Sequence, residues 1–467
     1  MFLALLMIAV PLAGCTGGDV TDDDDTVSDN TELNAANERI AELEALVQSD
    51  QTTISALVAT AEVDQARIVE LEEDLEGLCC TLEEMTVQYQ YGYDEGSDDA
   101  WYEGYVAGSA GSIQESTLDT IIARGSMKCG VKESQYGMGY MDAGTGVRSG
   151  LDISYCQALA AAIGLNPHTD VEFIPASGSD RFDKLASGTI DVLIRTTTWT
   201  TSRDADLNAD FAGTNFFDGQ GILVREDAYP AELVSNSATG LHGANICVGI
   251  GTTTEGNLVD WFSSQDIEFT SIPVSDAAEA TYKFQTGECD AFTGDMSAMV
   301  AKKWQLDGDG SMNGVDIWIA QELLSKEPLA AVTRDYDSEW NEIVGWVWWG
   351  MITAEEMGVT STNYASMASD ACSPTESGWG ASDPSMCRLL TENLGLGTTD
   401  NPLAGDWMQA VLSVVGNYGE AYDDAFCDGT YDGHSGSAAM QGCLISRVGT
   451  LNALVSEGGL QYAPPMR

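Results

Sequence analysis

The spacing of apolar residues divides the chain into an N-terminal region and a longer C-terminal region. Between residues 33 and 82, apolar side chains recur in a seven-residue pattern that contains no proline. A sustained repeat of this kind keeps one stripe of a helix facing a partner, so it predicts an α-helical coiled coil. At about 1.5 Å per residue, the rod would be about 75 Å long. The apolar seam residues are Leu33, Ile40, Val47, Ile54, Ala61, Ile68, Leu75 and Leu82, together with Ala36, Leu43, Leu57, Leu71 and Leu78.

The seam also indicates how the coiled coil would assemble. Asp50 and Asp64 interrupt its second position. β-Branched residues at the first position and leucine at the second favour a parallel dimer, so we expect a homo-oligomer. Cys79 follows a seam residue and would lie near its symmetry mate, within reach of an interchain disulfide. The alternative is a single amphipathic helix packed on the globular region.

From Thr117 onward, short apolar segments alternate with helical ones. This alternation predicts an α/β fold. Two such units, joined by the extended run 219–224, indicate two lobes with a cleft between them, where ligands bind beyond the carboxyl ends of strands. The predicted strands are 127–131, 171–174, 190–194, 246–250, 269–272 and 291–293, and the predicted helices are 152–163, 181–187, 256–263, 277–286 and 340–357.

The N-terminus has the pattern of an exported and lipid-anchored protein. Residues 1–14 form one apolar run, too short to span a bilayer but typical of a signal peptide. The run ends in Leu12-Ala13-Gly14-Cys15, which fits a lipobox with Cys15 as the lipidated residue. An ordinary signal peptide with an incidental cysteine is the alternative. We expect residues 15–32 to form an acidic tether and residues 83–115 a linker rich in Gly, Tyr and acids.

Charge and composition exclude several function classes. Lysine and arginine total 19 against 74 acidic residues, a formal net charge of −55. Phosphates would be repelled over most of the surface, which excludes nucleic-acid binding by general electrostatics. With only three histidines, far apart in sequence, a histidine-based metal site is not expected. Residues 307–314 alternate oxygen ligands as a calcium loop does, but Met312 and Trp318 occupy its sixth and twelfth positions, so we predict a surface hairpin turn. No metal and no cofactor is expected.

The cysteines point to disulfides. Ten remain beyond Cys15, and an even number in an exported protein favours pairing. Two pairs connect neighbouring predicted elements, and two join cysteines that are close in sequence. The four expected bridges are Cys129–Cys156, Cys247–Cys289, Cys372–Cys387 and Cys427–Cys443.

Several motifs, in order along residues 116–467, give the chain a family resemblance. They include Gly150-Leu151-Asp152-Ile153, Arg181-Phe182, the run 190–204, Asp218-Gly219-Gln220-Gly221, Gly251-Thr252-Thr253-Thr254-Glu255, Lys326-Glu327-Pro328-Leu329 and Gly416-Asn417-Tyr418-Gly419-Glu420. In these segments the chain resembles the type II solute-binding proteins of polar-amino-acid ABC transporters, and within them the general L-amino-acid-binding proteins.

The resemblance implies a type II periplasmic-binding-protein fold, with a hinge and an inter-lobe cleft. The first part of lobe one would comprise residues 116–222, lobe two residues 223–326, and the return to lobe one with C-terminal helices residues 327–467. Parts of 365–400 and 425–445 fall outside the resemblance and look like insertions.

By the same resemblance, Arg203, Thr198 and the backbone near Thr196 hold the α-carboxylate and part of the α-amino group of a free L-amino acid. A guanidinium suits this role because it donates two parallel hydrogen bonds to a carboxylate. Thr200 lies three residues before Arg203, so its hydroxyl can join the same loop. The alternative for Arg203 is a solvated surface arginine.

The second lobe would complete the site. Thr253 precedes a predicted helix, whose free N–H groups favour an anion. By resemblance it donates to the ligand carboxylate; the alternative is a helix N-cap. By resemblance Asp295 receives the α-ammonium. The loop 133–140 should form the side-chain pocket, with Tyr136 as its aromatic candidate.

These features predict an extracytoplasmic protein that captures amino acids and delivers them to the permease subunits of an ABC transporter. The cleft would close around one ligand by a hinge motion. One alternative is an enzyme on the same fold, such as a cyclohexadienyl dehydratase. Such an enzyme would bind a ligand without an α-amino group, whereas Asp295 together with Arg203 fits an amino acid better. Another alternative is a sensor or scaffold, which the coiled coil suggests.

Overall fold

The computed structural model describes Arg39 and residues 116–375, 380–427 and 442–467. The expected lipidation site Cys15, the tether 15–32, the linker 83–115 and, apart from Arg39, the coiled coil 33–82 lie outside the described residues. Among the helices that are described, none combines the length and apolar composition that a membrane crossing requires.

The first lobe is built on a mixed sheet in the strand order β5-β1-β6-β12-β7. Its first three strands are parallel, and β12 runs antiparallel to both β6 and β7. The strands are β1 (Met127–Val131), β5 (Val171–Pro175), β6 (Val192–Thr198), β7 (Ala209–Arg225) and β12 (Lys326–Arg334). The short strands β2 (Ser134–Gln135), β3 (Gly139–Met141) and β4 (Arg148–Ser149) form a separate small sheet after β1.

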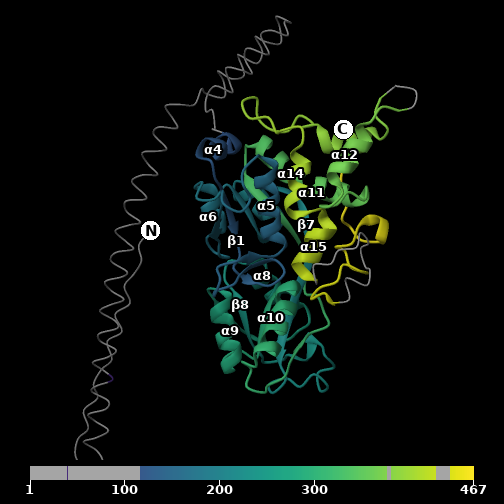
Figure 1. Cartoon of the computed structure of the whole chain (residues 1–467). Coiled ribbons are helices and arrows are strands. Elements are labelled where there is room, and N and C mark those ends of the chain that lie inside the picture. Colours follow the sequence, from purple (N-terminus) through teal and green to yellow (C-terminus); the bar gives the residue numbers. More distant parts are fainter. Residues whose placement is uncertain (1–38, 40–115, 376–379, 428–441) are drawn as a thin grey trace, which may run out of the picture. The chain divides into compact units, whose positions relative to one another are not determined.

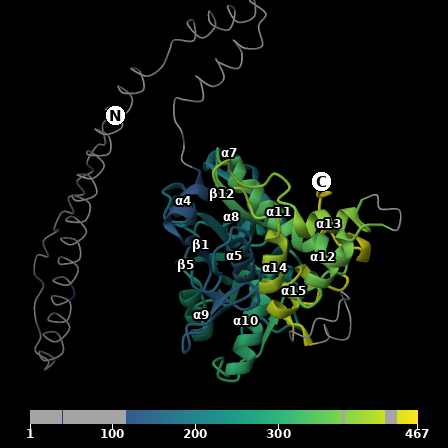
Figure 2. The same cartoon turned by 45° about the horizontal axis from the view of Figure 1, so that its top comes forward.

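Helix α5 (Leu151–Ala162) is the centre of the first lobe. Eleven of its residues are buried, as expected of a helix that is apolar on nearly every side. The C-terminal helices α11, α14 and α15 pack beside it (Figures 1 and 2). The helices of this part of the chain are α4 (Thr117–Arg124), α6 (Arg181–Ala186), α7 (Thr201–Asp206), α11 (Ser338–Glu356), α12 (Tyr364–Cys372), α13 (Pro384–Thr391), α14 (Trp407–Val415) and α15 (Tyr418–Phe426).

The second lobe repeats the α/β plan on a smaller scale. Strands β10, β8 and β9 are parallel neighbours, and β7 closes their edge in the antiparallel direction. In Figure 1 this lobe lies below the first. Its elements are β8 (Asn245–Gly249), α8 (Thr253–Ser264), β9 (Thr270–Val274), α9 (Ala277–Thr286), β10 (Ala291–Asp295), α10 (Met296–Asp309) and β11 (Ile317–Ile319).

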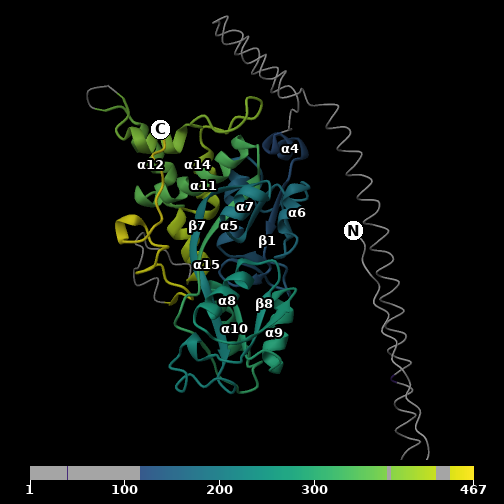
Figure 3. The ribbon, with the colours of Figure 1, turned by 180° about the vertical axis from the view of Figure 1, so that it is seen from behind.

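Strand β7 joins the lobes, because its two ends belong to different sheets. Residues 209–219 pair with β12 in lobe one, whereas residues 220–225 pair with β10 and β11 in lobe two. At about 3.3 Å per residue this strand would extend over about 55 Å, and Figure 3 shows it running from the first lobe toward α8 and α10. The chain returns to lobe one where β12 begins, at Lys326. The hinge is therefore two strands wide.

Three sequence predictions need correction. The strand expected at 190–194 spans Val192–Thr198, because its threonines pair with β12 and are buried. The run expected at 219–224 is the end of the much longer β7. The hairpin turn expected at 307–314 is wrong in its first half: Asp307–Asp309 end helix α10, and Gly310, with a φ of 67°, terminates it.

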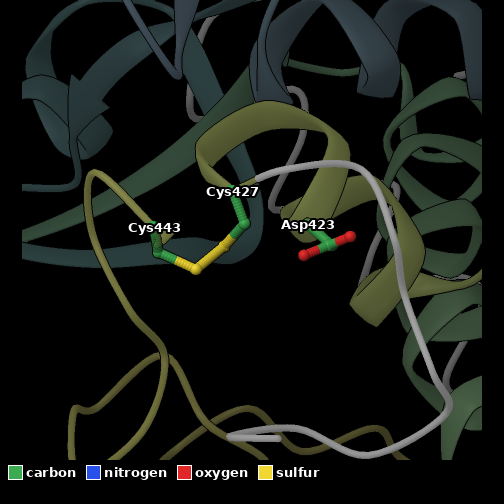
Figure 4. A group of neighbouring side chains, drawn as sticks. All are labelled: Asp423, Cys427 and Cys443. Atoms are coloured by element: carbon green, nitrogen blue, oxygen red, sulfur yellow. A yellow bond between two sulfur atoms is a disulfide. The ribbon is translucent and has the colours of Figure 1, made fainter. Parts of the chain in front are cut away.

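The structure contains all four disulfides that the sequence predicts: Cys129–Cys156, Cys247–Cys289, Cys372–Cys387 and Cys427–Cys443. Asp423 lies near the last pair, and the three side chains together resemble a set of metal ligands (Figure 4). The sulfur atoms are joined to each other, however, so they do not offer thiolates to a metal.

A buried ion pair fastens the C-terminal segment to the first lobe. Both terminal nitrogens of Arg447 donate to the Glu355 carboxylate, at 3.1 and 2.6 Å, and the two side chains are 0% and 4% exposed. The guanidinium also lies over the rings of Tyr418 and Tyr422. Removing one partner of such a pair leaves an uncompensated charge in the core.

We therefore predict that Arg447→Met lowers the free energy of unfolding by about 3–5 kcal/mol, measured by urea denaturation. Lys303→Met is the matched control, because it breaks the exposed pair with Asp307 and should cost no more than about 1 kcal/mol. Equal losses in the two variants would contradict the buried role of Arg447.

Candidate functional site

A cavity of about 510 Å³ lies between the lobes. Its walls come from the ends of β1 and β6 in lobe one, the end of β10 in lobe two, the first turns of α6, α8 and α9, and the first three turns of α10. Backbone N–H groups in the first turn of a helix have no partner within the helix, so such turns favour anions.

The structure brings six of the seven expected ligand-binding residues to this cavity. Its lining includes Tyr136, Thr196, Thr198, Arg203, Thr253 and Asp295. Thr200 is the exception: it does not line the cavity, and its hydroxyl instead caps helix α7 by accepting from the Arg203 N–H. The N-cap alternative for Thr253 is also off by one residue, since Thr252 occupies that position in α8.

The end of β6 carries a backbone distortion at the cavity wall. The pairing of β6 with β12 shifts register between Ala330 and Val332, as at a β-bulge. Thr196, which lies in this irregular stretch, has a φ of 44°, in the left-handed region that β-branched residues avoid. Its N–H donates to the buried carboxylate of Asp152 at 3.2 Å. Such strain costs on the order of 1–3 kcal/mol and is commonest at functional sites.

Polar contacts join the two lobes across the cavity. Gln135 donates to the Ser297 hydroxyl at 2.9 Å. Lys132 lies 3.4 Å from an Asp295 oxygen, and the hydroxyl oxygens of Thr198 and Thr253 are 3.4 Å apart. The structure thus holds the lobes against each other, as a protein with a closed cleft would.

The cavity has an unusual charge for so acidic a chain. Six of the 19 lysines and arginines line it, against four acidic residues. Lys184 pairs with Asp180, and Lys132 with Asp295. Among the described residues, no carboxylate forms an ion pair with the three lining arginines. The six basic residues are Lys132, Arg181, Lys184, Arg195, Arg203 and Lys302.

Burial makes these cations costly unless an anion lies beside them. Desolvation lowers the pKa of Arg195 to about 10, and desolvation together with the charges of Arg195 and Arg203 lowers the pKa of Arg181. Burial likewise lowers the pKa of Lys132 to about 8, against the opposing effect of Asp295. The Nε atoms of Arg181 and Arg195 are buried without a hydrogen-bond partner. An anion in the cavity would offset the repulsion among these cations, and it could accept hydrogen bonds from the two unpartnered Nε–H groups.

Residues 133–136, in the loop after β1, also line the cavity. Tyr136 stacks on Tyr140, with ring centroids 3.9 Å apart, and meets the edge of Trp304 at 5.0 Å. The hydroxyl of Tyr136 donates to that of Tyr140 at 2.9 Å. The Tyr136 ring is therefore fixed in place at the cavity edge.

Four further residues line the cavity that the sequence motifs do not predict as ligand-binding: Lys132, Gln135, Arg181 and Arg195. Arg181 and Arg195 do lie inside matched motifs. The scarcity of basic residues in the chain was the signal that could have found them. Lys132, Gln135, Arg181 and Arg195 come from separate parts of the chain, however, and only the tertiary fold brings them to one cavity.

Comparison with known proteins identifies the class to which this two-lobed architecture belongs. The model of the bacterial extracellular solute-binding proteins, family 3, matches residues 127–269. The chain is 37% identical over 358 residues to the glutamate/glutamine/aspartate/asparagine-binding protein BztA of Rhodobacter capsulatus, covering 77% of this chain and 95% of the relative. It is 35% identical over 363 residues to the general L-amino acid-binding periplasmic protein AapJ of Rhizobium johnstonii, covering 78% of this chain and 96% of that relative.

A solved structure agrees with these relatives. An ABC transporter periplasmic binding protein from Brucella ovis, with glutathione bound, superposes with a TM-score of 0.64 at 35% identity, covering 76% of this chain and all of that one. The fold is therefore the mixed α/β periplasmic-binding-protein fold, and the chain belongs to the bacterial extracellular solute-binding proteins, family 3. BztA and AapJ are both named as binding proteins rather than enzymes.

We predict that Arg203→Ala weakens amino-acid binding by at least a hundredfold. Arg203 is 8% exposed, and its guanidinium donates to the Thr198 carbonyl at 2.9 Å, so the group is held in place at the cavity. Without it, a ligand carboxylate would be buried unpaired. Calorimetry measures the effect, and Arg388→Ala, outside the cavity lining, is the control. Near-native affinity in Arg203→Ala would overturn this assignment.

Proposed function

We propose that the chain is the extracytoplasmic binding component of an amino-acid ABC transporter, and that its preferred ligands have an acidic side chain. Membership in the solute-binding family supports the first part. The observation that carries the second is the cluster of unpaired arginines in the cavity of a chain with a net charge of −55.

The cavity offers complementary groups for every charge of a dicarboxylic amino acid. Arg203 holds the α-carboxylate, and Asp295 receives the α-ammonium. Arg181 and Arg195, which have no ion-pair partner among the described residues, then remain for a second carboxylate. A bidentate guanidinium pair gives such a carboxylate both energy and orientation. A ligand with a cationic side chain would add its charge to theirs and be excluded.

We predict that L-glutamate or L-aspartate binds at least a hundredfold more tightly than L-lysine or L-arginine. A thermal-shift screen of the twenty amino acids, followed by calorimetry, measures this, because a ligand that binds only the native state raises the apparent stability.

Arg181→Met is the diagnostic variant, since it removes the charge but keeps much of the side chain's bulk. It should lower the affinity for L-glutamate by about tenfold or more and affect L-glutamine much less. A wild-type preference for basic or large apolar amino acids would contradict the proposal.

We further propose a lipid on Cys15 and an oligomer formed through the heptads at 33–82. Both proposals rest on the sequence. A rod of about 75 Å would hold the cleft away from the membrane, so the linker at 83–115 must allow it to reach the permease. Two cleft domains in one oligomer would raise their local concentration near the transporter.

The oligomer is tested by truncation. A chain that starts at residue 30 should be oligomeric and one that starts at residue 116 monomeric, and both should bind the ligand equally. Light scattering at micromolar concentration distinguishes them. A monomeric longer chain would leave the heptads as a lone helix.

A further inference from the structure

Glu327 is a completely buried carboxylate at the hinge that the ligand site described above does not use. It is the second residue of β12, is 0% exposed, and lies opposite Asp218 of β7. Among the described residues, no lysine or arginine forms an ion pair with it. Ionised carboxylates are almost never buried without partners, so its hydrogen bonds determine what it does.

Four neutral donors surround this carboxylate, two on each oxygen. One oxygen accepts from the hydroxyls of Thr198 and Thr253, the latter at 2.9 Å. The other accepts from the Asn257 amide at 2.8 Å and from the Ser325 hydroxyl at 2.5 Å. The four sites that a carboxylate offers are therefore filled.

The donors come from both lobes and from the hinge. Thr198 ends β6 in lobe one, whereas Thr253 and Asn257 lie in the first two turns of α8 in lobe two. Ser325 directly precedes β12. Glu327 thus ties α8 to the hinge in this closed arrangement, and opening the cleft would pull those bonds apart.

The proton count then fixes what the two threonines can offer a ligand. A hydroxyl has one proton, and both threonines give theirs to Glu327. Their oxygens line the cavity, 3.4 Å apart, with only lone pairs left. Two such oxygens suit an ammonium group and repel a carboxylate.

We propose that Glu327 is a positioning residue that turns Thr198 and Thr253 into acceptors for the ligand's α-ammonium and fastens α8 to the hinge in the closed state. The α-carboxylate is left to Arg203 and to the free N–H groups at the start of α8. This revises the hydroxyl role that the family resemblance implies for Thr253. The inference rests on the proposed function, since it takes an amino acid as the ligand.

The test compares L-glutamate with glutarate, which lacks only the α-ammonium group, in the wild type and in Glu327→Gln. Asn257 donates its amide to one side of residue 327, so the new glutamine oxygen should face Asn257 and its NH₂ the threonines. The threonine hydroxyls would then accept from the glutamine and no longer be held as acceptors for the ligand. We expect the affinity for L-glutamate to fall on the order of tenfold, and the affinity for glutarate to change at most about twofold.

Glu322→Gln is the matched control. Glu322 also accepts from a hydroxyl, that of Ser237 at 2.5 Å, and from a backbone N–H at 2.9 Å, but it lies outside the cavity lining. Its substitution should leave both affinities unchanged. If Glu327→Gln does not fold, Thr198→Val and Thr253→Val remove the same acceptor oxygens and should show the same selective loss.

A parallel loss of both ligands, or no loss of L-glutamate, in a folded variant would overturn the role of Glu327 while leaving amino-acid binding in place. Failure of the wild type to bind any amino acid would instead remove the proposed function, and this inference with it.

Discussion

Positive charge that is buried without an ion-pair partner is the constraint around which this cleft is organised. The surface of a chain with a net charge of −55 offers abundant partners for arginine, yet three arginines line the cavity without an ion pair among the described residues. Desolvation lowers the pKa of each. Such an arrangement is unfavourable by itself, and a bound anion would stabilise it. The backbone of Thr196, in the wall of the same cavity, is strained, and such strain is commonest at functional sites.

The fold makes such a site possible because the lining residues are divided between the two lobes. Strand β7 belongs to both sheets, and β12 begins where the chain returns to lobe one. The ends of β1 and β6 and the helix starts of lobe two line the same cavity. Each lobe therefore carries only part of the charge cluster: Arg181, Arg195 and Arg203 on one side, and Asp295 with the N-terminus of α8 on the other. These charges meet at the cavity, and Glu327 lies between the two sets, where it accepts from Thr198 and Thr253.

Much of the fold and of the candidate site could be predicted from the sequence, and the exceptions have physical causes. Strand β1 and helix α9 have the predicted limits, because their apolar pattern is local. Only the end of strand β7 is predicted from the sequence, because Asp210, Gly213 and Asp218 interrupt its apolar pattern. The rest of the strand is stabilised by its long pairing with β12. The motifs predict Arg203, Thr198 and Asp295, which do line the cavity, and Thr200, whose hydroxyl instead caps helix α7. Lys132 and Arg195 were missed because only the tertiary fold brings them to one cavity.

The central claim is that the unpaired arginines receive the side-chain carboxylate of the ligand. A crystal structure of the chain with L-glutamate tests it most directly, because it locates both carboxylates. We expect the α-carboxylate on Arg203 and the side-chain carboxylate within hydrogen-bonding distance of Arg181 or Arg195. A side-chain carboxylate directed toward solvent or the Tyr136 ring, with both arginines still unpaired, would contradict it.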